Sequence, residues 1–190
     1  METTIYMVRH AESPYTPGEE RTRGLSADGR AAAEKVADVL ADENIDWIAS
    51  SSYARAVDTV KPMADRLGLP VVLYEELVER LIKGPGREAE WPEIERAVER
   101  SFVEPDYALE GGETSRQARQ RAVPVIERLL RDHRGKRIVI GTHGNIMTII
   151  LNHYDPDIGY AFWRSTSRPD IYRLTFGANG FIRMERMWAL

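Results

Sequence analysis

Four short runs of apolar residues are spaced along the chain in the manner of strands. They cover residues 5–8, 47–49, 71–73 and 138–140. Each run is continuous rather than alternating with polar residues, which is typical of strands covered on both faces. Strands of this kind occur in mostly parallel sheets, so the pattern predicts such a sheet with helices on both sides.

Helical periodicity separates these apolar runs. Apolar residues recur at helical spacing at Ala32, Val36, Val39 and Leu40. Ser26 stands where it can cap the start of that helix. A second helix is expected over residues 57–67 and a third over residues 114–130, where Pro124 either bends the helix or marks its true start. The alternation of strand and helix predicts a three-layer α/β/α fold.

The C-terminal part of the chain follows a different pattern. Residues 170–176, "DIYRLTF", and 181–188, "FIRMERMW", are separated by "GANG", which predicts a closing hairpin at the edge of the sheet. The segment "KGPGREAEW", residues 83–91, is a loop-like insertion after which the core pattern resumes. We find no repeat or linker and expect one α/β domain over residues 1–190.

The composition is that of a soluble globular protein, with 43% hydrophobic and 29% charged residues. A net charge of −4 produces no field that would attract nucleic acid or an anionic membrane. The chain has no cysteine, and therefore no disulfide or thiolate metal site. It shows neither a signal peptide nor an apolar stretch of about 18 residues. We expect a cytoplasmic protein without nucleic-acid or membrane partners.

Cationic or titratable side chains follow three of the four apolar runs. Arg9 and His10 follow the first, Arg55 follows the second, and His143 follows the fourth, just before a helix that begins near Gly144. Ligands of open parallel sheets bind beyond the carboxyl ends of the strands. Arginine matches phosphate or carboxylate with its fork of donors, and a helix N-terminus adds backbone N–H groups. The sequence therefore predicts an anion site at this edge.

Five motifs carry a resemblance to a known family. In chain order they are "VRHAES" from residue 8, "LSADGRAAA" from 25, "SSSYARAVDT" from 50, "ELVE" from 76 and "THGN" from 142. Together they resemble the signatures of the histidine phosphatase superfamily, in its phosphoglycerate mutase-like branch. Three departures leave the substrate open: Ala11 replaces a glycine, a following asparagine is absent, and "KGPGREAEW" replaces a Trp-Glu-Gly segment.

The resemblance implies a mechanism with a covalent intermediate. His10 would attack phosphorus to give a phosphohistidine, which water then hydrolyses. Arg9, Arg55 and a protonated His143 would neutralise the phosphoryl oxygens. Glu79 would serve as general acid and base at the leaving oxygen. No cofactor is expected, and no metal either, since the four histidines show no ligand spacing.

Other polar residues have two readings each. Lys83 and Arg87 either reach a second anionic group of the substrate or form a solvated basic turn. Glu113, in "EGGETS", lies near the pocket rim in the family pattern and competes with Glu79 for the role of acid. Trp163 and Arg164 either line the pocket mouth or, for the tryptophan, belong to the core. The arginines between residues 116 and 134 fit a solvated helix face interleaved with acids.

The favoured hypothesis is a metal-independent phosphomonoester hydrolase of the histidine acid phosphatase type, in the phosphoglycerate mutase family, acting on a small molecule. One alternative is mutase-type transfer of the phosphoryl group within a substrate. In mutases of this family a longer segment typically helps to cover the site, whereas here only residues 80–110 are available. Another is a non-catalytic binder of phosphorylated ligands, which would typically have lost His10 or Glu79. A monomer and a homodimer both fit the sequence.

Overall fold

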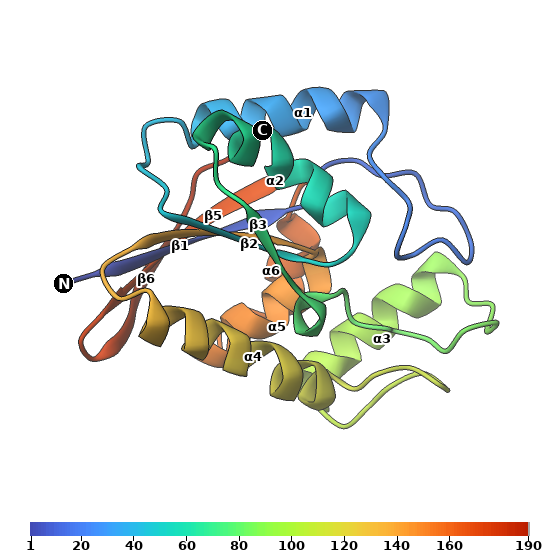
Figure 1. Cartoon of the computed structure of the whole chain (residues 1–190). Helices are drawn as coiled ribbons and strands as arrows, with labels where there is room; N and C mark the ends of the chain where they lie inside the picture. Colours follow the sequence, from blue (N-terminus) through green and yellow to red (C-terminus); the bar gives the residue numbers. More distant parts are fainter. Residues whose placement is uncertain (190) are drawn as a thin grey trace.

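The computed structural model describes residues 1–189 and contains one six-stranded sheet (Figure 1). Its strands are β1 (Thr3–Arg9), β2 (Trp47–Ser51), β3 (Val71–Tyr74), β4 (Arg137–Thr142), β5 (Asp170–Gly177) and β6 (Gly180–Arg186). The order across the sheet is β3-β2-β4-β1-β5-β6. The first four strands pair in parallel, whereas β5 and β6 are antiparallel. The mostly parallel sheet and the hairpin at its edge are confirmed.

Helices cover both faces of this sheet. They are α1 (Ala27–Val39), α2 (Ala54–Leu67), α3 (Trp91–Val103), α4 (Ser115–Asp132), α5 (Gly144–Tyr154) and α6 (Tyr160–Ser165), with a 3-10 turn η1 (Glu75–Leu77). Figure 1 shows α1 and α2 above the sheet and α4 and α5 below it. The three-layer architecture predicted from the sequence is therefore confirmed.

The central strand β1 explains why its apolar run is continuous. Ile5 and Met7 point into the core formed with α4 and α5, whereas Tyr6 and Val8 point into the core formed with α1 and α2. A strand with helices on both faces has no solvent side, so every position is apolar. The run at residues 71–73 differs, because β3 is an edge strand and Leu73 is 53% exposed. The expectation of burial on both faces was wrong there.

The helix ends show which local signals were read correctly. The Ser26 hydroxyl accepts a hydrogen bond from the Gly29 N–H at 2.9 Å, as expected of an N-cap. Helix α4 begins with a capping box made by Thr114 and Gln117 and continues through Pro124, so the proline does not mark its start. Helix α2 begins at Ala54, three residues before the predicted start. Helices α3 and α6 were not predicted.

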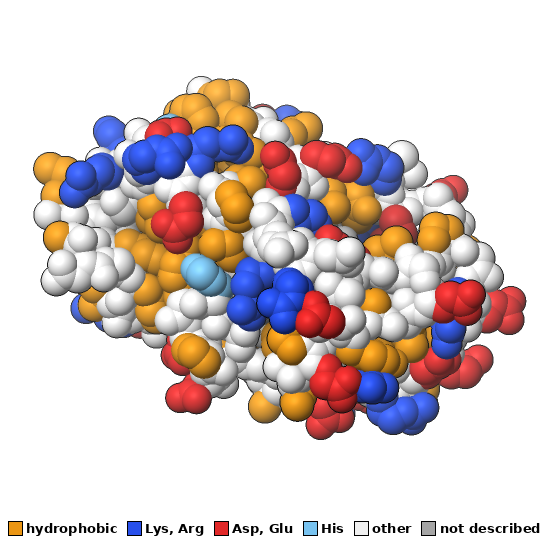
Figure 2. Space-filling model, turned by 90° about the horizontal axis from the view of Figure 1, so that it is seen from below, with side chains coloured by type: hydrophobic (Ala, Val, Ile, Leu, Met, Phe, Trp, Pro, Cys, Tyr) orange, Lys and Arg blue, Asp and Glu red, His pale blue; other side chains and the backbone are white. Residues whose placement is uncertain are grey.

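Four of the six arginines between residues 116 and 134 are exposed, as predicted, whereas Arg119 and Arg121 are half-buried. Arg116 pairs with Asp106 at 2.5 Å, and Arg121 pairs with Glu113 at 2.6 Å. Figure 2, which views the molecule from the side of α4 and α5, shows both basic and acidic side chains on this face. Within residues 1–189, none of the helices combines the length and the apolar character needed to cross a membrane.

Candidate active site

Parallel pairing of β1 with β4 brings together the two strand ends that are followed by a histidine. In the β1–β4 register Arg9 lies opposite Thr142, so the residues that follow, His10 and His143, leave the sheet at the same level. The His10 N–H donates to the Thr142 carbonyl at 2.9 Å, and the two imidazole centroids are 5.3 Å apart. With Arg55 from the start of α2, these side chains form one buried group. We call Arg9, His10, Arg55 and His143 the phosphoryl pocket.

His10 is held in one tautomer. Its Nδ1 lies 2.7 Å from the carbonyl oxygen of Ala11, and because a carbonyl can only accept, Nδ1 carries the proton. Nε2 is therefore left with its lone pair. Burial lowers the pKa of His10 well below its ordinary value of 6.5, and the charges of Arg55 and Arg9 lower it further. A neutral imidazole with a free Nε2 is suited to nucleophilic attack.

His143 is also neutral with the side chains in these positions. Burial is the main cause that lowers its pKa well below 6.5, followed by the charges of His10 and Arg55. Its Nε2 lies 2.8 Å from the Ser51 hydroxyl oxygen. The expectation of a protonated His143 therefore does not hold for the protein by itself. A phosphoryl group would act in the opposite direction, since negative charge favours the imidazolium.

Arg9 is fixed by the segment that connects α6 to β5. Its Nη1 donates to the Thr166 carbonyl at 3.1 Å and to the Thr166 hydroxyl. Burial, and after it the charge of Arg168, lowers the pKa of Arg9 to about 10, so the guanidinium remains charged at neutral pH. Gly144 makes room for this side chain, because a Cβ there would lie 2.8 Å from the Arg9 Cζ. The packing of Arg9 therefore explains why the motif "THGN" has a glycine at residue 144.

Arg55 is held by the loop in which the family pattern has an asparagine that this chain lacks. Its Nη1 donates to the Glu20 carbonyl at 2.6 Å, and its Nη2 lies 3.2 Å from the Glu20 carboxylate. The guanidinium is also 5.0 Å from the centroid of the Tyr53 ring. Because Arg55 is 1% exposed, burial lowers its pKa, and Glu20 partly offsets this effect. The loop before α1 therefore holds the second arginine of the pocket.

Glu79 lies at the N-terminus of α5. Its carboxylate accepts hydrogen bonds from the backbone N–H groups of Asn145 at 3.0 Å and Ile146 at 2.8 Å, and from that of Arg80 at 2.9 Å. The sequence assigned the free N–H groups of this helix to phosphate, but Glu79 takes those of Asn145 and Ile146. Leu77, two residues before Glu79, is fully buried, whereas Leu81, two residues after it, is 45% exposed.

The three tentative substrate residues have partners within the protein. The Lys83 ammonium donates to the Arg87 carbonyl, and Arg87 pairs with Glu93 at 2.7 Å. Both Glu113 carboxylate oxygens accept from Arg121, at 2.6 and 2.9 Å. Glu113 does line a cavity of about 520 Å³ together with Glu79, whereas Lys83 and Arg87 line neither of the two cavities described in this section.

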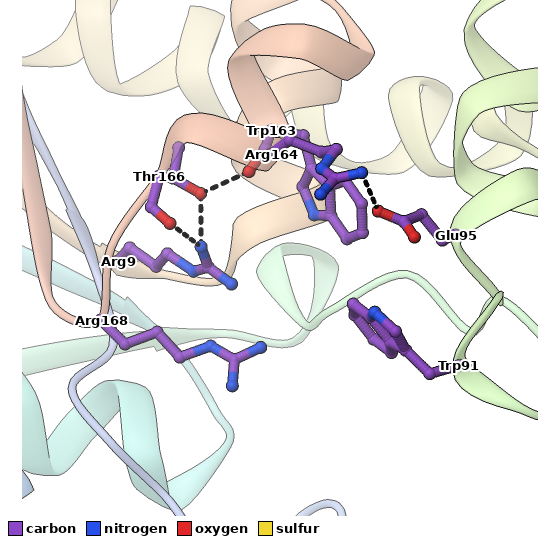
Figure 3. Close-up of a pocket in the computed structure, with 7 residues that line it drawn as sticks. All are labelled: Arg9, Trp91, Glu95, Trp163, Arg164, Thr166 and Arg168. Carbon is purple, nitrogen blue, oxygen red and sulfur yellow. Dashed lines mark hydrogen bonds and ion pairs between the residues drawn. The ribbon is translucent and has the colours of Figure 1, made fainter.

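A second cavity, of about 420 Å³, opens beside the phosphoryl pocket. Its lining consists of Arg9, Trp91, Glu95, Trp163, Arg164, Thr166 and Arg168 (Figure 3). Trp163 and Arg164 therefore line a pocket mouth, one of the two readings of these residues. Arg164 pairs with Glu95 at 2.6 Å, and Trp163, 9% exposed, also borders the core. We call this second cavity the rim cavity.

Sequence reasoning missed two arginines near the site. Arg23 donates to the Ser13 carbonyl at 3.0 Å, and its charge lowers the pKa of both His143 and Arg55. Arg168 lies beside Arg9 (Figure 3) and lowers the pKa of Arg9 and His10. Both belong to loops rather than to strand ends, so no periodic signal in the sequence marks them.

Curated proteins of related sequence include two named phosphatases. The glucosyl-3-phosphoglycerate phosphatase of Mycolicibacterium vanbaalenii is 25% identical over 170 residues, covering 77% of this chain and 71% of that protein. The metal-independent phosphoserine phosphatase of Arabidopsis thaliana is 28% identical over 160 residues, covering 78% and 67%. The phosphoglycerate mutase-like protein 4 of the same plant is 28% identical over 166 residues, covering 80% and 71%.

Solved structures share the fold across nearly the whole chain. A mycobacterial glucosyl-3-phosphoglycerate phosphatase superposes with a TM-score of 0.75 at 21% identity, covering 98% of this chain and 97% of that one. The model of the histidine phosphatase superfamily, branch 1, matches residues 5–185. Because this match includes every strand end of the phosphoryl pocket, the resemblance read from the sequence is confirmed, and the chain belongs to the histidine phosphatase superfamily.

Proposed function

We propose that the chain is a metal-independent phosphomonoester hydrolase in which His10 is the nucleophile. The observation that carries the proposal is the pairing of His10 and His143, 5.3 Å apart, with Arg9 and Arg55 in the same buried group. Two relatives that are named phosphatases support hydrolysis as the reaction. One of these relatives is named a metal-independent phosphatase, which supports a route without a metal ion.

The first step transfers the phosphoryl group to the enzyme. The lone pair on His10 Nε2 attacks phosphorus, a P–N bond forms, and the bond from phosphorus to the ester oxygen breaks. Glu79, carrying a proton at this stage, gives it to the leaving oxygen so that an alcohol departs. The Nδ1 proton stays on the ring, where the hydrogen bond to the Ala11 carbonyl stabilises the positive charge of the phosphorylated imidazole.

The second step regenerates the enzyme. Water attacks phosphorus from the side vacated by the alcohol, and Glu79 accepts one of its protons. The P–N bond breaks and its electron pair returns to Nε2, which releases inorganic phosphate. Glu79 thus ends the cycle protonated, as it began.

The cationic side chains stabilise both transition states. Arg9 and Arg55 are already oriented by Thr166 and Glu20, so little reorganisation is needed when negative charge spreads over the phosphoryl oxygens. His143 takes up a proton as the phosphoryl group enters and then donates a hydrogen bond to it. Each such donor in a preorganised site contributes about 10²-fold or more to kcat.

The defining experiment traps the covalent intermediate. Protein incubated with a ³²P-labelled phosphomonoester and quenched should retain label in an adduct that is stable in base and labile in acid. We expect His10→Ala to abolish the adduct and to lower kcat by about 10³-fold or more, because no other group forms the P–N bond. His153→Ala, which removes an exposed histidine of α5, is the matched control and should retain the label.

Three results would contradict the proposal. A fully active His10→Ala variant would remove the nucleophile from it. Interconversion of 2- and 3-phosphoglycerate faster than phosphate release would favour a mutase. Tight binding of phosphorylated ligands without turnover would favour a non-catalytic binder.

A second experiment separates the acid role of Glu79 from its role at the start of α5. Glu79→Gln keeps one of the two oxygens that accept backbone hydrogen bonds, replaces the other by an NH2 group that only donates, and cannot deliver a proton. We expect kcat/KM to fall by about 10²-fold or more for alkyl phosphates, because their leaving group needs protonation. The loss should be smaller for p-nitrophenyl phosphate, because its leaving group does not need a proton. Equal losses on both substrates, with an unchanged unfolding midpoint, would argue against the acid role.

The substrate is proposed to be a small molecule in the cytoplasm. Glucosyl-3-phosphoglycerate and phosphoserine, the compounds in the names of two relatives, each carry a carboxylate beside the phosphoryl group. The volume of about 420 Å³ in the rim cavity fits a leaving group of a few to a dozen heavy atoms. A panel of phosphomonoesters compared by kcat/KM tests this proposal, and exclusive activity on a phosphoprotein would oppose it.

A further inference from the structure

The charges around the rim cavity do not balance. The Glu95 carboxylate forms an ion pair with the Arg164 guanidinium at 2.6 Å. Asp170, whose charge acts on Arg9, is fully buried and pairs with Arg186 at 2.7 Å, while it also accepts hydrogen bonds from the Tyr172 hydroxyl and the Ser167 N–H. These two acids are therefore already paired with other arginines, and Glu79, a third acid whose charge acts on Arg9, accepts hydrogen bonds from three backbone N–H groups.

Arg168 is the cation left over. It is exposed at the cavity wall, and Figure 3 draws no interaction between it and the other lining side chains. Its neighbour Arg9 uses Nη1 on Thr166 and belongs to the phosphoryl pocket. The two guanidinium groups repel each other, since the charge of Arg168 lowers the pKa of Arg9. An anion placed against Arg168 would relieve that repulsion.

The opposite wall of the cavity is aromatic. Trp91 and Trp163 lie with ring centroids 6.1 Å apart, and Trp91 is 57% exposed. Figure 3 shows the guanidinium groups of Arg9 and Arg168 pointing into the space in front of Trp91. A molecule bound there has its carbon skeleton against an indole face and its polar groups toward two arginines.

We propose that Arg168 binds a carboxylate on the leaving alcohol of the substrate, while Arg9 binds the phosphoryl group. A carboxylate is favoured because a single uncompensated guanidinium matches one negative charge and presents the fork that carboxylate oxygens accept. The carbon skeleton between the two anions then lies against Trp91. The inference rests on the proposed function, and it narrows the substrate class to phosphomonoesters of small hydroxy acids.

The test compares substrates that differ only in the carboxylate. These pairs are 3-phosphoglycerate with glycerol 3-phosphate, and phosphoserine with phosphoethanolamine. For the wild-type protein we expect kcat/KM to be about tenfold or more higher for the carboxylated member of each pair, the size of one charge-assisted interaction. Arg168→Gln should reduce this preference to about twofold or less, while p-nitrophenyl phosphate hydrolysis falls by a smaller factor.

A matched control removes another arginine from the same cavity. Arg164→Gln deletes a charge that Glu95 already balances, so the preference for carboxylated substrates should persist. A wild-type protein that hydrolyses p-nitrophenyl phosphate but shows no carboxylate preference would overturn the inference and leave the proposed function standing. An equal loss on all substrates in Arg168→Gln would place this arginine on the phosphoryl group instead and would also overturn it.

Binding measurements keep the inference testable if turnover fails. In His10→Ala protein, intrinsic tryptophan fluorescence reports on the rim cavity through Trp91 and Trp163. We expect 3-phosphoglycerate to bind about tenfold more tightly than glycerol 3-phosphate, and the added Arg168→Gln substitution to remove that difference. Absence of turnover with this binding preference would refute only the proposed function. Equal binding of the two ligands would refute the inference.

Discussion

The phosphoryl pocket and the rim cavity lie side by side and share Arg9, yet they are built differently. Every side chain of the pocket is buried, with Arg55 at 1% and His143 at 0% exposure. In the rim cavity Arg164 and Arg168 are exposed and Trp91 is more than half exposed. The pocket residues begin at strand ends of one sheet, whereas the rim residues come from α3, α6 and the segment before β5.

The difference indicates a division of labour. Strand ends packed between two helix layers hold the reacting groups to a fixed geometry, as a covalent transfer requires. Exposed side chains on inserted helices and loops tolerate sequence change with little effect on stability. The pocket would therefore define the reaction and the rim would define which leaving group is accepted. Predictions on matched residues in the two regions test this division.

The largest contrast is expected between two arginines. Arg55→Gln removes a buried cation that Glu20 holds in place, and with it a proposed donor to the phosphoryl group, so kcat/KM should fall by about 10²- to 10³-fold on every phosphomonoester. Arg164→Gln, in the exposed rim pair with Glu95, should cause a loss smaller by at least about tenfold. Steady-state kinetics on p-nitrophenyl phosphate measures both, and similar losses would contradict the division of labour.

A single methyl group should disturb the pocket through Arg9. Gly144→Ala would place a Cβ 2.8 Å from the Arg9 Cζ, and the guanidinium must move because the α5 backbone cannot. We expect kcat/KM to fall by about tenfold through misplacement of one donor, with little change in the unfolding midpoint. An unchanged kcat/KM would show that Arg9 can move without loss of activity. This result would contradict the fixed geometry that distinguishes the phosphoryl pocket from the rim cavity.

The smallest effect concerns the stability of the buried pocket against acid. The pKa values of His10 and His143 are well below 6.5 in the folded protein, whereas unfolded histidine titrates near 6.5. Below about pH 6.5 the unfolded chain therefore binds more protons, and the free energy of unfolding should fall on acidification, by up to about 1.4 kcal/mol per pH unit for each histidine.

Urea unfolding at pH 8 and pH 5.5 checks the sign and the source of this effect. His143→Asn should reduce the loss of stability between the two pH values, because one of the two buried imidazoles is removed. His153→Asn, at an exposed position on α5, should leave the loss as it is in the wild type. A free energy of unfolding that rises on acidification would contradict the neutral state assigned to the two pocket histidines.

The sequence alone predicted the strands of the sheet and the side chains that gather at one of its edges. Continuous apolar runs identify the strands, and two of them are followed within three residues by a side chain of the phosphoryl pocket, as Val8 is by Arg9 and His10. Parallel strands place those followers at one edge, so linear spacing was enough to predict that His10 and His143 would meet. The hairpin at residues 170–186 was equally clear, since its strands flank a glycine-bearing turn.

Only the tertiary structure decided what surrounds these residues. Three contacts near the site join segments more than 30 residues apart in the sequence: Glu20 with Arg55, Thr166 with Arg9, and Glu79 with the start of α5. No periodic pattern in the sequence predicts them. The same holds for Arg168 beside Arg9. The lowered pKa of His143 in the protein without a ligand could not be predicted for the same reason: charge states depend on burial and on all cations nearby, which are properties of the packed molecule rather than of the order of its residues.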